Sequence, residues 1–490
     1  MKIPIHLQKK QQLMNRLSIV TVLIPLFVSF LTPVRSQPGV VRQLEACPCQ
    51  VNIDSSFRTH CAYLIVPENR KKKNGKTIKL PFIWVESKNP AKRKDPVLFT
   101  SGGPGGSSLG WAQGASKSLI INDRDCIAFE QRGTHFAVPN LWSNELSDAI
   151  AESYRRNLDK DSMVVVGVKR YKKALEAKGI DLTGYNTDET VSDMHDLLAT
   201  LKVDSVNLIG ISYSGGLMTA VLQRDPSRIR SLILDSPLPT FVPIDEDEPA
   251  NFAESLNVLF RHVESDSTDK ARYRNLKAKF EQYFTAIDGK KFTMPYVAKG
   301  KTDTLLINYT RRELLDILVN TSMKEVPYAI TEMIKGNHNR YIRPFLEHKL
   351  ERTNGPSGMR ISVYCADQTA YHSEKVLQQL YEVYPYLKGY PINDVYKAMC
   401  DCWNVPPITP ATKQPFYSAK PALLADGEMD NACRPLYIDR IHHYMPNSQR
   451  VLFKNHAHGV GGAEWGRLIQ EFLTNPYQKL QSSKPEVVVY

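Results

Sequence analysis

Short apolar runs that end in turn residues recur in the first half and near the end of this chain. Each run lacks the alternation of polar and apolar positions that marks a half-buried strand, so each fits a strand buried on both faces, as in a parallel sheet. These runs span residues 95–103, 125–133, 205–210, 228–237, 420–428 and 449–459. Residues 79–87 alternate and are rich in aromatic side chains, so they predict one further strand.

A helical pattern lies between two of these predicted strands, in residues 189–203. Its apolar side chains recur at the spacing of one helix face. They are Val191, Met194, Leu197, Leu198 and Leu201. Strand, helix and strand in alternation predict an α/β fold with a doubly wound, mostly parallel sheet.

The middle of the chain has a different pattern. From about residue 243 to about residue 405, helical periodicity dominates and buried-strand runs are scarce, after which strand signals resume. A helical block that interrupts a sheet indicates an inserted cap. We therefore expect a core in two parts, residues 37–242 and 406–490, with a helical cap formed by residues 243–405.

Residues 1–36 have the pattern of a signal peptide. A basic start is followed by an apolar run at 17–31 and by small residues just before Gln37. The run is shorter than the roughly 20 residues that a transmembrane helix needs, although an uncleaved anchor remains the alternative. We expect an exported protein, periplasmic or secreted, without stable membrane association after the leader is cleaved.

All eight cysteines follow this leader. An even number of cysteines behind an export signal favours disulfides. Zinc is the alternative because Cys400 and Cys402 are close together, but zinc sites usually have C-x2-C spacing and no His-x3-His partner follows. We expect disulfides and no metal, and the sequence leaves the pairing open.

The formal net charge of the chain is +12. Its basic residues are scattered or form short runs such as residues 70–76, where a hairpin turn is expected. A solvated turn explains such a run, so no nucleic-acid partner is expected.

The stretch "GISYSGG", residues 210–216, joins the strand 205–210 to a segment with a helical pattern. A strand, a sharp turn and a helix form the context of a nucleophile elbow, Gly-x-Ser-x-Gly. Two serines, Ser212 and Ser214, each match half of that motif. Ser212 has Gly210 two residues before it and a small residue two after it, whereas Ser214 would move the turn into the helix. The sequence therefore predicts Ser212 as the nucleophile.

A glycine-rich loop, residues 100–110, follows the strand that starts at residue 95. Two glycine pairs around Pro104 let the backbone turn tightly and leave amides free to point at a ligand. The Lys-Ser/Thr ending of a phosphate-binding loop is absent. We expect an oxyanion hole made by the N–H groups of Gly103 and Tyr213, and a plain turn is the alternative.

An acid and a histidine follow later strands in the order that a Ser-Asp-His triad needs. Asp430 follows the strand run 420–428, and the next run, 449–459, ends with His456 and His458. In this arrangement His458 takes the proton of Ser212, and Asp430 orients the imidazole and stabilises its charged form. No cofactor is needed for this chemistry, and none is expected.

Together these motifs resemble the α/β-hydrolase fold, and more narrowly the proline iminopeptidase family with its secreted tripeptidyl-aminopeptidase-like branch. The matching stretches occur in the family's order. They are "CAYLIVPENR" (61–70), "SGGPGG" (101–106), "EQRGT" (130–134), "VNLIGISYSGG" (206–216), "RIRSLILDSPLP" (228–239), "GEMD" (427–430) and "HAHGV" (456–460). The resemblance implies a serine exopeptidase that releases residues from a free peptide N-terminus under a helical cap. It places the triad at Ser212, Asp430 and His458, whereas His456 does not match.

Three residues depart from the family's pattern. Ser101 replaces a histidine, Glu130 replaces an aspartate, and Ser214 replaces the second glycine of the elbow. None of these changes removes a member of the triad, but the change at Ser214 affects the elbow itself.

The resemblance also implies that cap carboxylates bind the α-ammonium group of the substrate. The acidic cluster at 244–254 offers Glu246, Glu248 and Glu254, and a solvated linker is the alternative. The sequence thus leads to an exported serine aminopeptidase that acts on short peptides. An exported carboxylesterase or lipase with the same triad, and an inactive binding protein on this scaffold, are the other hypotheses, and the polarity of the cleft would separate the first two.

Overall fold

The computed structural model describes residues 43–73, 75–351 and 355–490. The expected leader, residues 1–36, lies outside these ranges. One large sheet runs through the described residues. Its strands are β1 (Gln43–Ala46), β2 (Thr59–Pro67), β3 (Thr77–Val85), β4 (Val97–Thr100), β5 (Cys126–Phe129), β6 (Val206–Ile211), β7 (Ile229–Asp235), β10 (Ala422–Gly427), β11 (Ser448–Phe453) and β12 (Val487–Val489).

Sixteen α-helices accompany the strands in the described part of the chain. Those outside the segment between β7 and β10 are α1 (Gly110–Ala115), α2 (Glu145–Arg155), α3 (Lys160–Ala177), α4 (Thr187–Thr200), α5 (Tyr213–Arg224), α15 (Leu436–Tyr444) and α16 (Gly462–Thr474). Those between β7 and β10 are α6 (Ile244–Ser265), α7 (Ser267–Arg272), α8 (Leu276–Ala286), α9 (Arg311–Val319), α10 (Val326–Ile334), α11 (Asn339–Glu351), α12 (Gly358–Asp367), α13 (Glu374–Val383) and α14 (Lys397–Trp403).

The strand order of the sheet is β1-β2-β3-β5-β4-β6-β7-β10-β11-β12. Strands β5, β4, β6, β7, β10 and β11 are parallel to one another, whereas β1 to β3 and β12 pair with their neighbours in antiparallel fashion. The predicted doubly wound, mostly parallel α/β sheet is confirmed. In such sheets ligands bind beyond the carboxyl ends of the parallel strands, which is where the predicted site residues lie in the sequence.

Both faces of the central strands are buried, which explains their unbroken apolar runs. Leu208 and Leu232 point into one apolar cluster with side chains of α4, α5 and α15. Their neighbours Ile209 and Ile233 point into a second cluster with side chains of α1 and α16. Successive residues of a strand face opposite sides, so each apolar run supplies both layers.

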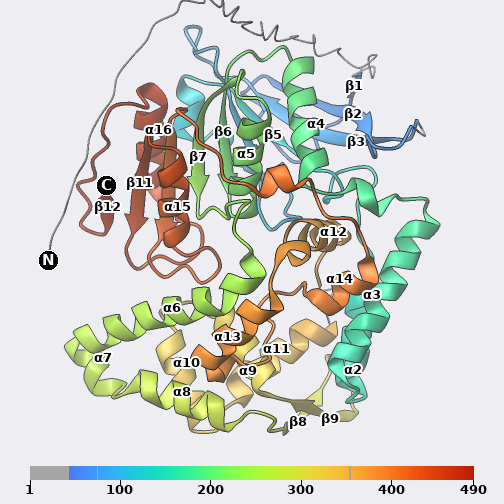
Figure 1. The fold of residues 1–490 in the computed structure, drawn as a ribbon, viewed down its shortest axis with the longest axis vertical. Coiled ribbons are helices and arrows are strands. Elements are labelled where there is room, and N and C mark those ends of the chain that lie inside the picture. The colour runs from blue at the N-terminus through green and yellow to red at the C-terminus, as the bar shows by residue number, and fades with distance from the viewer. Residues whose placement is uncertain (1–42, 74, 352–354) are drawn as a thin grey trace, which may run out of the picture. The chain divides into compact units, whose positions relative to one another are not determined.

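The segment between β7 and β10 is mainly helical and has an apolar cluster of its own, which includes Phe252, Phe280 and Leu314. In Figure 1 its helices α6, α8 and α13 lie on the side of the sheet toward which the arrowheads of β7 and β11 point. It also contains a small antiparallel sheet that the sequence did not predict, β8 (Phe292–Val297) with β9 (Thr304–Tyr309).

Two helices of this segment pack on the main core. Met359 and Ile361 of α12 and Met399 and Trp403 of α14 join the same apolar cluster as the strands of the sheet. Helix α3, from the first part of the chain, packs against α14, and α2 packs against α11 (Figure 1). The helical segment is therefore joined to the core along a broad surface.

Two disulfides are present in the described chain. Cys49 pairs with Cys61, and Cys365 of α12 pairs with Cys400 of α14. The predicted disulfides thus involve four of the eight cysteines, and the other four, Cys47, Cys126, Cys402 and Cys433, are free.

Across the described ranges we find no group of three or more His, Cys, Asp or Glu side chains that could hold a metal ion. Within those same ranges every helix is too short or too polar to span a bilayer.

Candidate active site

Ser212 occupies a sharp turn between β6 and α5. Its backbone has φ 58° and ψ −128°, a conformation that residues other than glycine rarely adopt. The Ser212 N–H donates to the Asp235 carbonyl at 3.0 Å, and the Ser212 carbonyl accepts from Gly215 at 2.8 Å and Leu238 at 3.0 Å. The surrounding backbone therefore holds this residue in the geometry of a nucleophile elbow.

Ser214 lies in the first turn of α5 and points into the protein. Its side chain is fully buried, and its hydroxyl shares a hydrogen bond with the Thr100 hydroxyl at the end of β4. The space around it is tight, because a Cβ atom on Gly210 would press against the Ser214 carbonyl. Of the two serines, Ser212 lines the large cavity described below and Ser214 does not.

Asp430 is fixed in a tight turn after β10. Its Oδ1 accepts hydrogen bonds from the backbone N–H groups of Ala432 and Cys433, both at 2.8 Å. Its Oδ2 lies 2.7 Å from Nδ1 of His458. Because the carboxylate is almost fully buried and accepts on both oxygens, Asp430 sets the orientation of the imidazole and places the hydrogen on Nδ1.

The loop that carries His458 is held by two residues at the end of β7. The Gly459 N–H donates to the Ser236 hydroxyl at 2.9 Å, and the Val460 N–H donates to Asp235 Oδ1 at 3.0 Å. Asp235 and Ser236 were not among the residues predicted for the site. Their position could have indicated a role, since "LDS" ends a strand that pairs with the strand before Ser212.

His456 takes a different direction from His458. Its side chain is partly exposed, and its Nδ1 lies 3.0 Å from the backbone carbonyl of Lys454. Only His458 contacts the acid, as the resemblance implied.

Two opposing effects act on the pKa of His458. Burial of the ring lowers its pKa, but the hydrogen bond with Asp430 and the negative charges of Asp430 and Asp235 raise it. The net direction is upward from the ordinary value. His458 is therefore protonated over a wider pH range than a free histidine.

This upward shift predicts the acid limb of the pH profile. A general base must be neutral to accept a proton, so activity falls as the pH drops through the raised pKa of His458. The acid limb of kcat/KM for p-nitrophenyl acetate, an ester that has no amine, should have its midpoint above about 6.5. A midpoint at or below that value would contradict the effect of the buried carboxylates.

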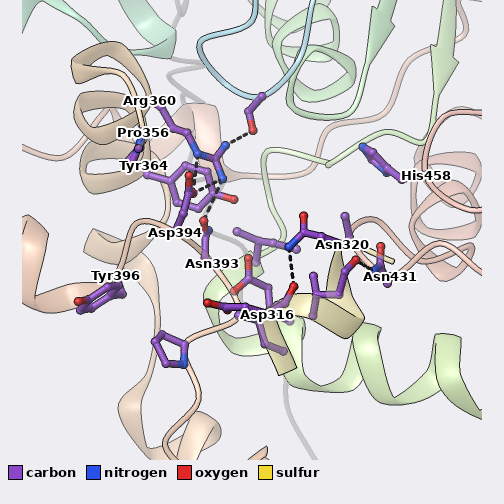
Figure 2. A pocket seen from close by; sticks show the side chains of 18 of the residues that line it. Asp316, Asn320, Pro356, Arg360, Tyr364, Asn393, Asp394, Tyr396, Asn431 and His458 are labelled. Atoms are coloured by element: carbon purple, nitrogen blue, oxygen red, sulfur yellow. Dashed lines mark hydrogen bonds and ion pairs between the residues drawn. The ribbon is translucent and has the colours of Figure 1, made fainter. Parts of the chain in front are cut away.

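A cavity of about 1110 Å³ opens beside Ser212 and His458. One part of its wall is apolar and includes Leu146, Ile150 and Met399. Charged groups from the helical segment form other parts of it, and Figure 2 shows Arg360 and Asp394 together on one wall, with His458 on a separate element. The cavity can thus hold a ligand with both apolar and charged parts.

The glycine-rich loop lies directly against the elbow. A Cβ atom on Gly102 would be 2.8 Å from Cβ of Ser212, so only glycine fits there. Gly103 lines the cavity with φ 115°, and Tyr213 is the first residue of α5, where an N–H has no partner within the helix. Gly103 and Tyr213 stay our prediction for the oxyanion hole.

Glu130, one of the departures from the family, supports this loop. Its Oε2 accepts from the Ser108 N–H at 2.8 Å and from the Ser107 hydroxyl at 3.0 Å, and its Oε1 accepts from the Thr134 hydroxyl at 2.8 Å. Glutamate thus still supplies a carboxylate at this position, and its hydrogen bonds hold the glycine-rich loop in place.

The comparisons with known proteins agree with this geometry. The family described as alpha/beta hydrolase fold matches residues 95–259, and the family described as TAP-like protein matches residues 389–480. The chain is an α/β-hydrolase. It is a serine-peptidase-like member of that group whose carboxyl-terminal part is TAP-like.

The similar curated proteins are peptidases at low identity. Serine protease Hip1 from Mycobacterium tuberculosis is 21% identical over 432 residues, which cover 79% of this chain and 79% of that protein. Tripeptidyl aminopeptidase from Streptomyces coelicolor is 24% identical over 205 residues, which cover 39% of this chain and 37% of that protein. Among solved structures, proline iminopeptidase from Mycobacterium smegmatis aligns at 14% identity over 84% of this chain and 97% of that chain, with a TM-score of only 0.37.

The three candidate carboxylates of α6 differ in their surroundings. Glu246 accepts a hydrogen bond from the Ser373 N–H, and Glu254 pairs with Arg434 at 2.7 Å. Glu248 lines the cavity with Ser212 and His458, and no basic side chain of the described residues forms an ion pair with it. Burial and the charge of Asp245 raise the pKa of Glu248 well above its ordinary value.

Cys433 is a cavity residue that the sequence analysis missed. Its thiol is free and lines the cavity together with Ser212. Burial and the charges of Asp430 and Asp426 raise its pKa well above the ordinary value. Cys433 is therefore a neutral thiol beside the nucleophile, and not a second nucleophile.

Proposed function

We propose that this α/β-hydrolase is an exported serine aminopeptidase that cleaves short peptides from a free N-terminus. The observation that carries the proposal is the position of Glu248, a half-buried carboxylate in the same cavity as Ser212 and His458. A cavity made for simple esters has no need of a half-buried carboxylate that forms no ion pair within the described residues.

The electrostatics of Glu248 favour a cationic ligand. Burial and the charge of Asp245 raise the pKa of Glu248, and the charge of Arg360 and the Asn393 N–H offset this only in part. The α-ammonium group of a peptide would supply a further positive charge and hydrogen-bond donors, which would stabilise the ionised acid. Binding energy from this contact would hold the N-terminus at a fixed place relative to Ser212.

The proposed reaction proceeds through an acyl-enzyme. Ser212 Oγ attacks the peptide carbonyl while His458 Nε2 takes its proton, and Asp430 stabilises the imidazolium that forms. The amides of Gly103 and Tyr213 would donate to the oxyanion. His458 then protonates the leaving amine, and a water activated in the same way releases the N-terminal fragment.

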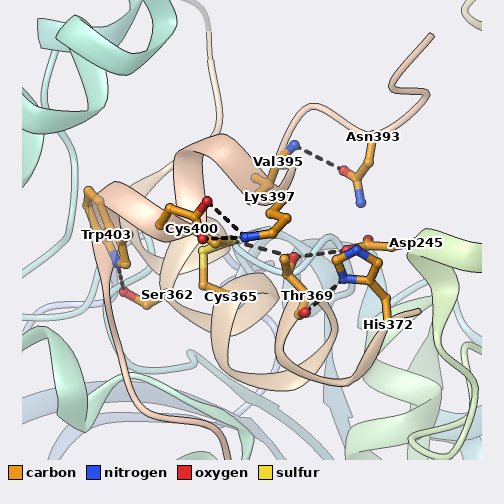
Figure 3. Close-up of a disulfide and its surroundings, with 11 residues drawn as sticks. Asp245, Ser362, Cys365, Thr369, His372, Asn393, Val395, Lys397, Cys400 and Trp403 are labelled. Carbon is orange, nitrogen blue, oxygen red and sulfur yellow. Dashed lines mark hydrogen bonds and ion pairs between the residues drawn. A yellow bond between two sulfur atoms is a disulfide. The ribbon is translucent and has the colours of Figure 1, made fainter. Parts of the chain in front are cut away.

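Export fits the disulfides of the chain. The Cys365–Cys400 bridge joins α12 to α14 beside the cavity, and Figure 3 shows it near Thr369 and Asp245. Disulfides persist in oxidising compartments, which supports a periplasmic or secreted location.

The alternative, an exported carboxylesterase, would use the same triad on an apolar acyl group. The apolar wall of the cavity suits it, whereas Glu248 does not. A pair of substrates separates the two functions: one peptidyl arylamide with a free N-terminus and the same compound with an acetylated N-terminus.

We expect the free peptide to be cleaved at least about 100-fold more efficiently, since a lost charged contact costs roughly 3 kcal/mol. Glu248→Gln should remove most of this preference by raising KM for the free peptide. Glu254→Gln, on the same helix but paired with Arg434 outside the cavity, is the matched control and should keep the preference. Equal cleavage of free and acetylated peptides by the unmodified enzyme would rule out the aminopeptidase.

A further inference from the structure

Arg360 connects two parts of the cavity that the proposed mechanism uses separately. It projects from α12, and its guanidinium reaches three acceptors on two other segments (Figure 2). Its Nη1 donates to the Gly103 carbonyl, its Nε donates to Asp394 Oδ1 at 2.7 Å, and its Nη2 donates to Asn393 Oδ1 at 2.9 Å.

The contact with Gly103 bears on the oxyanion loop. A glycine at φ 115° has no side chain to restrict its backbone, so other contacts must fix the direction of its N–H. The Gly102 carbonyl before it accepts from the Gly106 N–H at 3.1 Å, and the Gly103 carbonyl after it accepts from Arg360. With both neighbouring carbonyls held, the peptide plane that carries the Gly103 N–H is fixed.

The other contacts of Arg360 lead to the proposed amine site. Asn393 accepts from Arg360 through its side chain, and its backbone N–H lies near enough to the Glu248 carboxylate to lower the pKa of that group. Asp394 pairs with the same guanidinium at 2.6 Å, so the segment that carries both residues is tied to α12. Arg360 therefore holds both the Gly103 loop, which lies beside Ser212, and Asn393, which lies beside Glu248.

We propose that Arg360 is a positioning residue that fixes the Gly103 amide for acyl transfer and couples that loop to the amine-binding carboxylate Glu248. The amine part of this inference rests on the proposed function, whereas the loop part needs only the acyl transfer at Ser212. Arg360 does not have to touch the substrate, because it acts through Gly103 and Asn393. A lysine could not reproduce these three hydrogen bonds, since its ammonium is compact and lacks the planar fork that spreads the donors of Arg360 toward Gly103, Asn393 and Asp394.

The test compares Arg360→Met and Arg360→Lys with Arg434→Met. Arg434 is a matched control, because it also bridges segments through carboxylates, Glu254 and Asp247, but does not line the cavity. Each variant is assayed on p-nitrophenyl acetate, with the Ser212→Ala background subtracted, and on a free peptidyl arylamide. Thermal unfolding of each variant is measured alongside.

Arg360→Met should lower kcat by about 10- to 100-fold on both substrates, because a misplaced oxyanion donor costs about that much. It should also raise KM for the free peptide only, and Arg360→Lys should fall between Arg360→Met and the unmodified enzyme. Arg434→Met should keep kcat within about threefold on both substrates.

An unchanged kcat on the ester in Arg360→Met, or an equal loss in Arg434→Met, would overturn the proposal. If Arg360→Met does not fold, Arg360→Lys carries the same comparison, and full ester activity in it would count against the proposal. Equal cleavage of free and acetylated peptides by the unmodified enzyme would remove the amine part alone, while the ester assay still tests the role of Arg360 at Gly103.

Discussion

Replacing Ser212 with alanine should lower kcat by about 10⁶-fold, to a rate set by binding and the oxyanion donors alone. The reason is that no other nucleophile is available in its place. Ser214 is fully buried in a hydrogen bond with Thr100, and the Cys433 thiol is held neutral by a pKa raised well above the ordinary value. Steady-state kinetics on a peptidyl arylamide, with folding checked by thermal unfolding, would measure the loss.

Ser214→Ala is the matched control for this substitution. It removes a hydroxyl two residues away without adding volume, and it leaves the Thr100 hydroxyl without its partner. We expect a stability cost of about 1–3 kcal/mol and a kcat within about tenfold of the unmodified enzyme. If Ser214→Ala lost activity as Ser212→Ala does, the assignment of the nucleophile would be wrong.

Asp430→Asn should lower kcat by about 10⁴-fold with little change in KM. An asparagine at this position has the same shape, but it can present its amide group to His458 and so favour the tautomer with the hydrogen on Nε2. Nε2 of His458 would then already carry a hydrogen, so it could not accept the proton of Ser212. The turn would stay in place, because the backbone N–H groups of Ala432 and Cys433 could still donate to Oδ1 of the asparagine.

His456→Ala is the control for the second half of the triad. The His456 side chain contacts the Lys454 carbonyl through Nδ1 and packs edge-on against the Phe453 ring, but it does not contact Asp430, so its loss should leave kcat within about twofold. An Asp430→Asn variant with more than about a tenth of the activity would contradict the role of Asp430.

The central strands could be predicted because their position in the fold dictates their sequence. A strand with helices on both faces must be mainly apolar, and β4, β6, β7 and β10 each contain a short apolar run. Strand β1 gave no such signal, since all four of its residues are exposed and only pairing with β2 defines it. The β8–β9 hairpin was missed because Pro295 interrupts β8, and proline is rare inside strands.

Asp430 and His458 do meet, whereas the role of Ser212 stays a prediction. The triad could be proposed from the sequence because each candidate follows a strand in a fixed order. The residues that support it could not, because long-range packing creates their contacts. Arg360 and Gly103 are 257 residues apart, and no local pattern joins them. Likewise Glu246, Glu248 and Glu254 share α6, and only the rotation of that helix against the core decides which of them faces the cavity.

The central claim is that Ser212 attacks peptides held by their free N-terminus. It is tested most directly by mass spectrometry of the intact and digested protein after reaction with a short peptidyl diphenyl phosphonate, compared with its N-acetylated form. The account predicts one adduct on Ser212, formed at least about tenfold faster from the free-amine compound. An adduct on another residue, or equal rates for the two compounds, would contradict it.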